Sequence, residues 1–475
     1  MTPRPPRAGT PGTRASLITA AVAAFMVSLD STIVNLALPV LGRELGGGRA
    51  DVEWVMDGYT LALAAVMLGA GALSDALGAR RIFLLGLAVF GLASGACGLA
   101  GTMPVLIAAR LVQGVGAALS LPSSLALVRA GGSSPAERGR AIALWSAAGG
   151  VGMAAGPLIG GAIVAAAGWR WVFWINVLVC PLALPATALL TRPVPARPRR
   201  LDLGGQLAAT PAIAGLVFVL IEGPRLGWSR PAVPVASAVF VLGAAGFLLA
   251  ERRAAEPLLP LPLARKPEFA GSAGLGALFN FAFYGLMFAL SLLLQQVRGD
   301  SPLTAGLSFL PLTGLITAAN LVAPRLTARR GSTFVLLVGL ALFAAGLLGT
   351  ALTEPLSSSL PLLLCLLPVG FGGGLIVPTM TTRLLESAPP ELAGAASGAF
   401  NTARQVGGAV GVAVFGPLLG TGSELTQGFR LCVLLSVAAA ALGALISATV
   451  LRRRPTEPAP GTAEAPAGQA PAGIR

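Results

Sequence analysis

An acid and an amide interrupt an apolar stretch near the start of the chain. Leu29 to Pro39 reads LDSTIVNLALP, which places Asp30 and Asn35 among apolar residues. A charge at the centre of a membrane helix costs about 2.5 to 3.5 kcal/mol on insertion scales, so such residues usually serve a function. Asp30 is therefore the leading candidate to carry a proton, and Asn35 is a polar candidate for substrate contact.

An arginine and a glutamine on a later stretch lie at a depth comparable to that of Asp30. Arg110, Gln113 and Gly114 are spaced i, i+3 and i+4, so they share one helix face. At 1.5 Å per residue, Arg110 lies about 10 Å from the outer helix end and Asp30 about 21 Å from the inner end. A nearby arginine favours an ionised carboxylate and unpaired burial favours a neutral one, so a changing separation would load and release a proton. Snorkelling of Arg110 is the alternative, and Gln113 is a second candidate for substrate contact.

A further acid, Asp57, lies in the outer third of the next apolar stretch. It is a rival proton carrier at similar depth, and a permanently ionised carboxylate at the interface is the alternative. Glu222 lies near an outer helix end and is expected to be solvated.

Aromatic and polar side chains recur with helical spacing in a stretch of the second half. Phe279 and Phe283 are i, i+4 neighbours, as are Asn280 and Tyr284, which gives an aromatic face with two polar groups. Aromatic walls bind lipophilic and cationic compounds, whereas packing in the core is the alternative. Arg404, on a later stretch, either binds an anionic group or satisfies neighbouring carbonyls.

Glycines recur every four residues in another stretch of the first half. Gly152, Gly156 and Gly160 form a flat ridge on one helix face, where a second backbone can approach closely. Pro157 interrupts the hydrogen-bond ladder beside the ridge and is expected to kink the helix. Ordinary packing of small residues is the alternative.

Membrane helices are needed to position these residues, and the composition predicts them. The chain is 55% apolar and only 11% charged, with a mean hydropathy of +0.80. Fourteen apolar stretches of about 17 to 28 residues are each long enough to cross a hydrocarbon core. Those around Ile213 and Val241 are the weakest, and twelve remain without them. We therefore expect an all-α polytopic membrane protein.

The basic residues predict the orientation. Cytoplasmic loops carry an excess of Lys and Arg, and most of the 33 basic residues fall in inner loops and tails if both termini are inside. Because these residues are spread over short loops, the net charge of +14 does not indicate nucleic-acid binding.

Two basic, Pro-rich segments, 192–202 and 251–268, divide the chain. Six apolar stretches precede the first segment and six follow the second. The expected parts are a cytoplasmic basic tail (1–14), an N-terminal six-helix bundle (15–191), a linker with two extra helices (192–268), a C-terminal six-helix bundle (269–451) and a disordered cytoplasmic tail (452–475).

The residue types exclude several chemistries. The sequence contains no histidine, which excludes imidazole metal sites and the usual catalytic triads, and it has no Walker-type phosphate loop. Its four cysteines lie in apolar stretches, where a disulfide framework is not expected. We expect no enzyme activity, no cofactor and no metal.

Six motifs carry a family resemblance: LDSTIVNLALP (29–39), GALSDALGARR (71–81), LIAARLVQGVGAA (106–118), GGVGMAAGPLIGG (149–161), WRWVFWINV (169–177) and SGAFNTARQVGGAVG (397–411). In their order they resemble the 14-helix drug:proton antiporters of the major facilitator superfamily over nearly the whole chain. The resemblance implies two six-helix bundles plus two extra linker helices, with substrate near the midplane. It also implies a role in proton coupling for Arg110 and identifies the glycine-rich fifth span as the antiporter signature.

The second of these motifs supplies the gating candidates Gly71, Asp75, Gly78 and Arg81. In the family, the Asp and the Arg help to gate the cytoplasmic side, with the Asp against a helix N-terminus of the other half. That placement is favourable by about 0.3 to 1 kcal/mol. Ala76 and Ala79 stand where basic residues are common, so a full charge relay is not expected.

These residues together predict a proton-coupled antiporter that exports drugs or other amphipathic molecules across the cell inner (plasma) membrane by alternating access. The expected partners are a lipophilic or cationic substrate, protons and the lipid bilayer, with no nucleic acid, and the chain is expected to be a monomer. The alternatives are a dedicated exporter of one endogenous metabolite or antibiotic, an importer, or a non-transporting receptor, in which Asp30 and Arg110 would have no obvious use.

Overall fold

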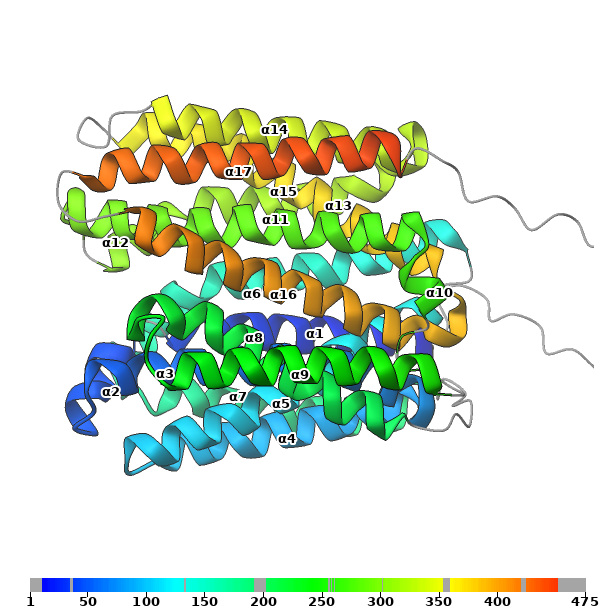
Figure 1. Ribbon diagram of the computed structural model, residues 1–475, viewed down its shortest axis with the longest axis horizontal. Helices are drawn as coiled ribbons and strands as arrows, with labels where there is room; N and C mark the ends of the chain where they lie inside the picture. The colour runs from blue at the N-terminus through cyan, green and yellow to red at the C-terminus, as the bar shows by residue number, and fades with distance from the viewer. Residues whose placement is uncertain are drawn as a thin grey trace, which may run out of the picture.

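The computed structural model is a bundle of long helices that lie side by side (Figure 1). It describes residues 11–34, 37–131, 134–191, 202–254, 257, 259, 261–300, 302–352, 359–419 and 424–451. No β-strand occurs among these residues, so the all-α prediction is confirmed for them. The tail predicted to be disordered (452–475), most of the N-terminal tail and Asn35 lie outside the described residues.

The first half contains α1 (Pro11–Ile33), α2 (Leu38–Glu44), α3 (Arg49–Leu77), α4 (Ala79–Leu99), α5 (Met103–Gly131), α6 (Pro135–Ala167) and α7 (Trp171–Leu190). Local sequence explains where several of them begin and end. Gly78, with φ of +96°, ends α3 and starts α4, a backbone conformation that favours glycine. Ser134 caps α6 by accepting a hydrogen bond from the Glu137 amide. In this half, α1 packs against α5, α6 and α7.

The second half contains α11 (Pro267–Leu292), η2 (Leu293–Val297), α12 (Pro302–Ser308), α13 (Leu310–Arg330), α14 (Ser332–Leu352), α15 (Ser359–Ser387), η3 (Pro390–Leu392), α16 (Ala393–Leu419) and α17 (Glu424–Thr449). In this half, α11 packs against α15, α16 and α17. Its core is rich in Phe and Leu side chains from α11, α14 and α15.

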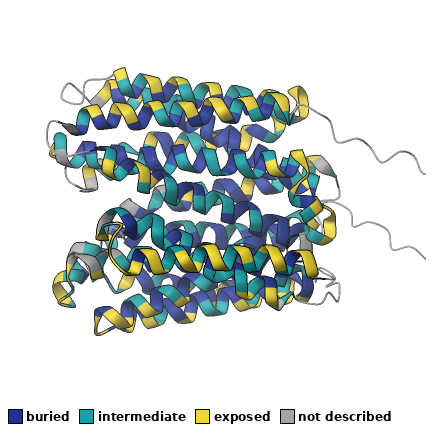
Figure 2. Cartoon of the chain, viewed as in Figure 1, coloured by how far each residue is buried: buried dark blue, intermediate teal, exposed yellow. Residues whose placement is uncertain are grey.

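Between the halves come α8 (Leu203–Leu226), α9 (Ala232–Arg253) and the short α10 (Leu261–Ala264). Asp202 caps α8 by accepting a hydrogen bond from the Gly205 amide at 2.7 Å. Helix α8 packs against α3 and α16, whereas α9 packs mainly against α8. Figure 2 shows exposed residues all along α9, as expected for a helix at the edge of a membrane bundle.

The two halves meet along α3 and α16 and along α6 and α13. Backbones approach closely at the first pair, since a Cβ added to Gly71 would lie 2.2 Å from the Gly394 carbonyl oxygen. Helices from the two halves therefore contact each other directly, and α3 and α5, which carry part of the candidate site, both pack against α16.

Twelve helices among the described residues are long and apolar enough to span a membrane. Helix α6 would be a thirteenth, bent by 45° between Met153 and Leu158, a segment that contains Pro157. The two stretches predicted to be weakest, now α8 and α9, are among the twelve. The difference from fourteen arises at α6, which is set apart by its bend, and at α16, where glycines and the polar Asn401, Arg404 and their neighbours lower the apolarity.

Candidate functional site

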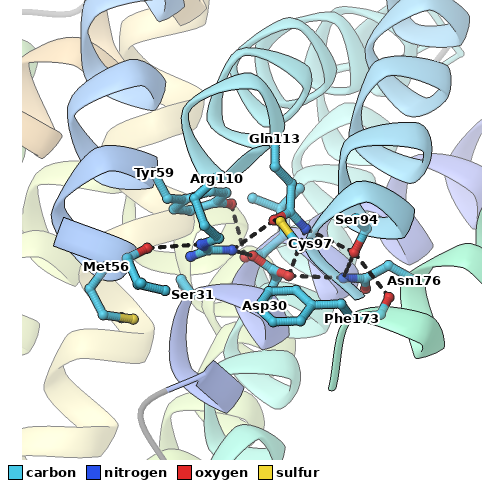
Figure 3. Close-up of polar contacts among 12 residues, drawn as sticks. Asp30, Ser31, Met56, Tyr59, Ser94, Cys97, Arg110, Gln113, Phe173 and Asn176 are labelled. Atoms are coloured by element: carbon cyan, nitrogen blue, oxygen red, sulfur yellow. Dashed lines mark hydrogen bonds and ion pairs between the residues drawn. The ribbon is translucent and has the colours of Figure 1, made fainter. Parts of the chain in front are cut away.

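The site centres on an ion pair between α1 and α5. Arg110 Nη1 lies 2.6 Å from Asp30 Oδ2, and both side chains are fully buried (Figure 3). Two oppositely charged groups removed from water are retained only where the geometry is good, because each loses its hydration. The structure thus brings Asp30 and Arg110 into contact, as their comparable depth along the membrane helices suggested.

Amides from two further helices hold the other carboxylate oxygen. Asp30 Oδ1 accepts hydrogen bonds from Gln113 Nε2 at 2.9 Å and from Asn176 Nδ2 at 2.8 Å. Both amides also donate to Ser94 Oγ, which in turn donates to the Phe173 carbonyl oxygen. Gln113, a candidate for substrate contact, therefore serves the carboxylate in this arrangement.

Arginine 110 also contacts α3, which links the ion pair to a third helix. Its Nε donates to the Val55 carbonyl oxygen at 2.9 Å, and its guanidinium carbon lies 4.3 Å from the centre of the Tyr59 ring. Its Nη1 also donates to Gln113 Oε1 at 2.8 Å. Its Nη2 has no hydrogen-bond partner in the part of the chain described. A movement of Arg110 would therefore change contacts with α1, α3 and α5.

Asn176 and Ser94 belong to the site but were not predicted from the sequence. Asn176 lies in the WRWVFWINV motif, an amide within an apolar helix, and that was the only available signal. Ser94 lies on α4, where a serine among alanines and glycines is typical of ordinary helix packing. Their roles depend on contacts between distant segments.

Asp57 does not join this network. It is partly buried on α3 and lies within electrostatic range of Glu222 on α8. Glu222 is only 3% exposed, so the expectation that it is solvated is wrong. The reason is that α8 packs against α3 and covers this glutamate.

The glycine ridge of α6 faces α1 next to Asp30. A Cβ on Gly152 would lie 2.3 Å from the Phe25 carbonyl oxygen, and one on Gly160 would lie 2.9 Å from that of Ile33. Gly156 faces Thr32, whose hydroxyl donates to the Met153 carbonyl oxygen at 3.2 Å. Any larger residue on this ridge would push away the helix that carries the acid.

At the other end of α3, Asp75 holds the N-terminus of α16. Its two carboxylate oxygens accept hydrogen bonds from the Gly394 and Ala395 amides, both at 2.7 Å. Negative charge is favourable at a helix N-terminus, where amides lack partners within the helix. Arg81 is exposed and makes no polar side-chain contact with another described residue.

The neighbouring basic residues serve other contacts at this end. Arg80 donates to the Thr191 carbonyl oxygen at 2.9 Å, within the first half. Arg129 donates to the Ala388 carbonyl oxygen at 3.1 Å and so forms a second link between the halves. At this end of the bundle, Asp75 and Arg129 both connect the two halves.

The candidate substrate residues of the second half separate into core and polar groups. Phe283 is 6% exposed and stacks on Phe279 with ring centres 5.6 Å apart, so these two rings belong to the core. Asn280 and Arg404 contact each other, with Nε of the arginine 3.3 Å from Oδ1 of the amide. Tyr284 lies one helical turn beyond Asn280 on α11.

Comparisons with known proteins agree with this architecture. The model of the Major Facilitator Superfamily matches residues 20–412. A methylenomycin A resistance protein of Streptomyces coelicolor is 38% identical, with 92% of both chains covered. The multidrug resistance protein Stp of Mycobacterium tuberculosis is 36% identical over 85% of this chain and 75% of its own.

A third relative is the tetracenomycin C resistance and export protein of Streptomyces glaucescens, 38% identical over 85% of this chain and 75% of its own. The crystal structure of the human organic anion transporter MFSD10 (TETRAN) has a TM-score of 0.68 at 18% identity, and the match covers 92% of this chain and all of that one. At that identity, the likeness concerns the fold alone. The chain therefore belongs to the Major Facilitator Superfamily and is a multi-pass membrane transporter rather than an enzyme.

Proposed function

We propose that this transporter is a proton-coupled antiporter that exports drugs or other amphipathic small molecules by alternating access. The carrying observation is the fully buried Asp30–Arg110 ion pair inside the helix bundle. The names of the relatives, which include resistance, multidrug resistance and export proteins, support export as the direction of transport.

The geometry supports a simple proton step. A proton that arrives from the outer side forms an O–H bond on a carboxylate oxygen of Asp30, which removes the negative charge that Arg110 faces. Arg110 then loses its ionic partner, and its contacts with Val55 and Tyr59 transmit the change to α3. Release of the proton to the inner side restores the ion pair.

The inner gate in this proposal is the Asp75 contact with α16. Opening toward the cytoplasm requires the Gly394 and Ala395 amides to leave the carboxylate, and also requires Arg129 to leave Ala388. Each contact joins one half to the other, so their loss separates the inner ends. Gly71 and Gly78 shape the backbone on which Asp75 sits.

We place fourteen spans in the membrane, which adds α6 and α16 to the twelve most apolar helices. Helix α16 has 27 residues and is long enough to cross a core of about 30 Å at 1.5 Å per residue. The proposed parts are two six-helix bundles (15–191 and 269–451), joined by a linker (192–268). Both termini are cytoplasmic in the plasma membrane, and the transporter works as a monomer surrounded by lipid.

Everted membrane vesicles test this proposal. With a panel of lipophilic compounds that includes anionic, neutral and cationic members, the wild-type chain should dissipate an imposed pH gradient in response to at least one of them, and Asp30→Asn should abolish this dissipation at equal expression. Asp51→Asn, which removes an exposed acid, is the matched control and should transport normally. Full proton-coupled transport by Asp30→Asn would refute the assignment of Asp30 as the proton carrier. The same measurement on Asp57→Asn tests whether Asp57 carries the proton instead.

A dedicated exporter of one antibiotic is the second candidate. Two of the relatives are named for a single compound, methylenomycin A or tetracenomycin C. Gradient dissipation by one compound in a broad panel, rather than by many, would favour this candidate.

A further inference from the structure

Arg404 is a cation deep inside the bundle, and no carboxylate among the described residues pairs with it. It lies 11 residues into α16 from Ala393, or about 17 Å at 1.5 Å per residue, which is near the membrane midplane. Its polar partners among the described residues are two amide oxygens, Asn280 Oδ1 at 3.3 Å and Asn401 Oδ1 at 3.5 Å. Its guanidinium also lies 5.6 Å from the Phe400 ring centre.

The two amides turn their oxygens toward the guanidinium, and one of them, Asn280, leaves its donor free. Asn401 uses its Nδ2 on the Ser397 carbonyl oxygen at 3.0 Å, which turns its oxygen toward Arg404. Asn280 is 1% exposed, accepts from Arg404 through Oδ1, and leaves Nδ2 without a hydrogen-bond partner. A buried donor left unpaired beside a cation calls for an acceptor from outside the described chain.

The surrounding helices leave space for these side chains. A Cβ on Gly276 would lie 3.0 Å from Arg404 Cγ, and one on Gly408 would lie 3.1 Å from the Tyr284 ring. Glycine at both positions lets the arginine and the tyrosine lie in the contact between α11 and α16. Arg404 and Tyr284 are partly exposed, whereas the amides of Asn280 and Asn401 are buried, so the arginine and the tyrosine are the accessible residues of the cluster.

The cluster faces the first half of the transporter. Helix α16 packs against α3 and α5 of that half, and Tyr284 lies within electrostatic range of Tyr59 on α3. Tyr59 is the residue whose ring lies over Arg110. The chain contains only two tyrosines, and they lie near each other between the two arginines.

We propose that Arg404, Asn280 and Tyr284 form a binding site for the anionic group of the substrate, and that the exported compounds are amphipathic molecules with a carboxylate or sulfonate. The inference rests on the proposed function and narrows its substrate class. A planar guanidinium with free N–H groups fits two oxygens of such an anion, and the Asn280 amide donates to one of them. Aromatic surface from Tyr284 contacts the apolar body of the compound.

This assignment differs from the lipophilic or cationic substrate expected from the aromatic residues. Phe283 and Phe279 pack in the core and so are not available as an aromatic wall. A cationic compound near Arg404 would meet like charge with no carboxylate from the described residues beside it. The side chains that remain accessible in this region favour an anion.

Binding of matched fluorescent probes to the full chain in phosphatidylcholine nanodiscs tests the proposal. The probes are 1-anilinonaphthalene-8-sulfonate, which carries an anionic group, and N-phenyl-1-naphthylamine, which shares its skeleton without that group. Empty nanodiscs give the lipid background. Arg404→Gln should weaken binding of the sulfonate at least tenfold and change binding of the neutral amine less than twofold.

Two further variants separate charge from folding. Asn280→Asp places a carboxylate beside Arg404 and should weaken sulfonate binding about as much as Arg404→Gln does, without removal of the arginine. Arg404→Lys keeps the charge but loses the two-pronged geometry, so its loss should be intermediate. Arg430→Gln is the matched control, because Arg430 is exposed at the start of α17, and its binding should equal that of the wild type.

Equal losses for the two probes, or sulfonate binding that is independent of Arg404 and Asn280, would overturn the assignment. So would the absence of specific sulfonate binding by the wild-type chain. Gradient dissipation by any compound of the panel that persists while these results fail would locate the error in the anion site. If the wild-type chain dissipated the pH gradient with no compound of the panel, the proposed function itself would be refuted.

Discussion

Each half of the transporter holds one arginine deep within its helices, and the two have different partners. Arg110 is fully buried and meets a carboxylate at 2.6 Å, whereas Arg404 is partly exposed and meets two amide oxygens at 3.3 and 3.5 Å. Both guanidinium groups lie near aromatic rings. Each half therefore places an arginine within the bundle beside an aromatic ring, but only Arg110 faces a carboxylate among the described residues.

Under the proposed function and the proposed anion site, this difference would divide the work between the halves. The charge of Arg110 is balanced by Asp30, so protonation of Asp30 would make the first half the one that responds to protons. The charge of Arg404 meets no carboxylate among the described residues, so the second half would take a charge brought by the substrate. In this proposal, proton and substrate occupy separate sites that communicate across the α3–α16 contact.

Loss of the acid should have the largest effect on stability and should distinguish the two arginines. Asp30→Ala leaves Arg110 buried without a counter-charge, and we expect it to lower the free energy of unfolding by about 3 to 5 kcal/mol. Arg404→Gln breaks no ion pair and should change it by about 1 kcal/mol or less. Thermal or denaturant unfolding of the purified chains in detergent measures both.

The double variant Asp30→Asn/Arg110→Gln is the control, since it removes both charges from the site. It should recover most of the stability lost in Asp30→Ala. A double variant as unstable as Asp30→Ala would show that the cost does not come from an unpaired arginine.

The next largest effect should be a difference in the steady-state concentration ratio of anionic and neutral substrates when a membrane potential is applied. Each elementary charge that crosses 100 mV is worth about 2.3 kcal/mol, so export of a monoanion gains that amount relative to a neutral analogue under an inside-negative potential. This corresponds to roughly a fiftyfold difference in the concentration ratio reached at steady state. Proteoliposomes with a valinomycin-imposed potassium potential measure this ratio, and equal ratios for anionic and neutral compounds would remove the charge distinction between the halves.

Weakening the Asp75 contact between α3 and α16 should have a moderate effect on stability. Asp75 is at the inner end of the helix that contacts Arg110, and it holds the start of the helix that carries Arg404. Asp75→Asn loses the charge and one of two acceptors, at a cost of about 1 to 2 kcal/mol.

Amide hydrogen exchange at Gly394 and Ala395 reports this loss directly. Exchange at both amides should become faster in Asp75→Asn and should stay unchanged in Asp51→Asn, which alters the opposite end of α3. Unchanged exchange in Asp75→Asn would mean that the acid does not hold α16.

Part of this comparison could be predicted from the sequence, because the depth of a residue along a membrane helix follows from the residue count and the helix rise. Counting residues placed Asp30 and Arg110 at comparable depth, and the structure has them in contact. The all-helical fold followed from composition in the same way. These inferences need only helix rise and hydropathy.

Other features depended on which faces of distant helices meet, and sequence spacing does not contain that information. Asn176 reaches Asp30 from α7, and Glu222 is covered because α8 docks on α3. Phe283 looked like a substrate contact because its helix has an aromatic stripe, yet the stripe turns toward Phe343 and the core. The count of apolar helices fell short at α6 because the helix is bent near Pro157, and at α16 because glycines and polar residues lower its apolarity.

The smallest effect concerns the tyrosine that lies over Arg110. Tyr59 places its ring 4.3 Å from the guanidinium carbon, whereas its hydroxyl makes only a 3.5 Å contact with the Val27 carbonyl oxygen. Tyr59→Phe keeps the cation–π contact and should change the free energy of unfolding by less than about 0.5 kcal/mol, while Tyr59→Leu should lose roughly 0.5 to 2 kcal/mol. Unfolding measurements on both variants, repeated in an Arg110→Gln background, isolate the ring–cation energy. If Tyr59→Phe proved as costly as Tyr59→Leu, the hydroxyl rather than the ring would support this arginine, and the two arginines would no longer share an aromatic partner as their common feature.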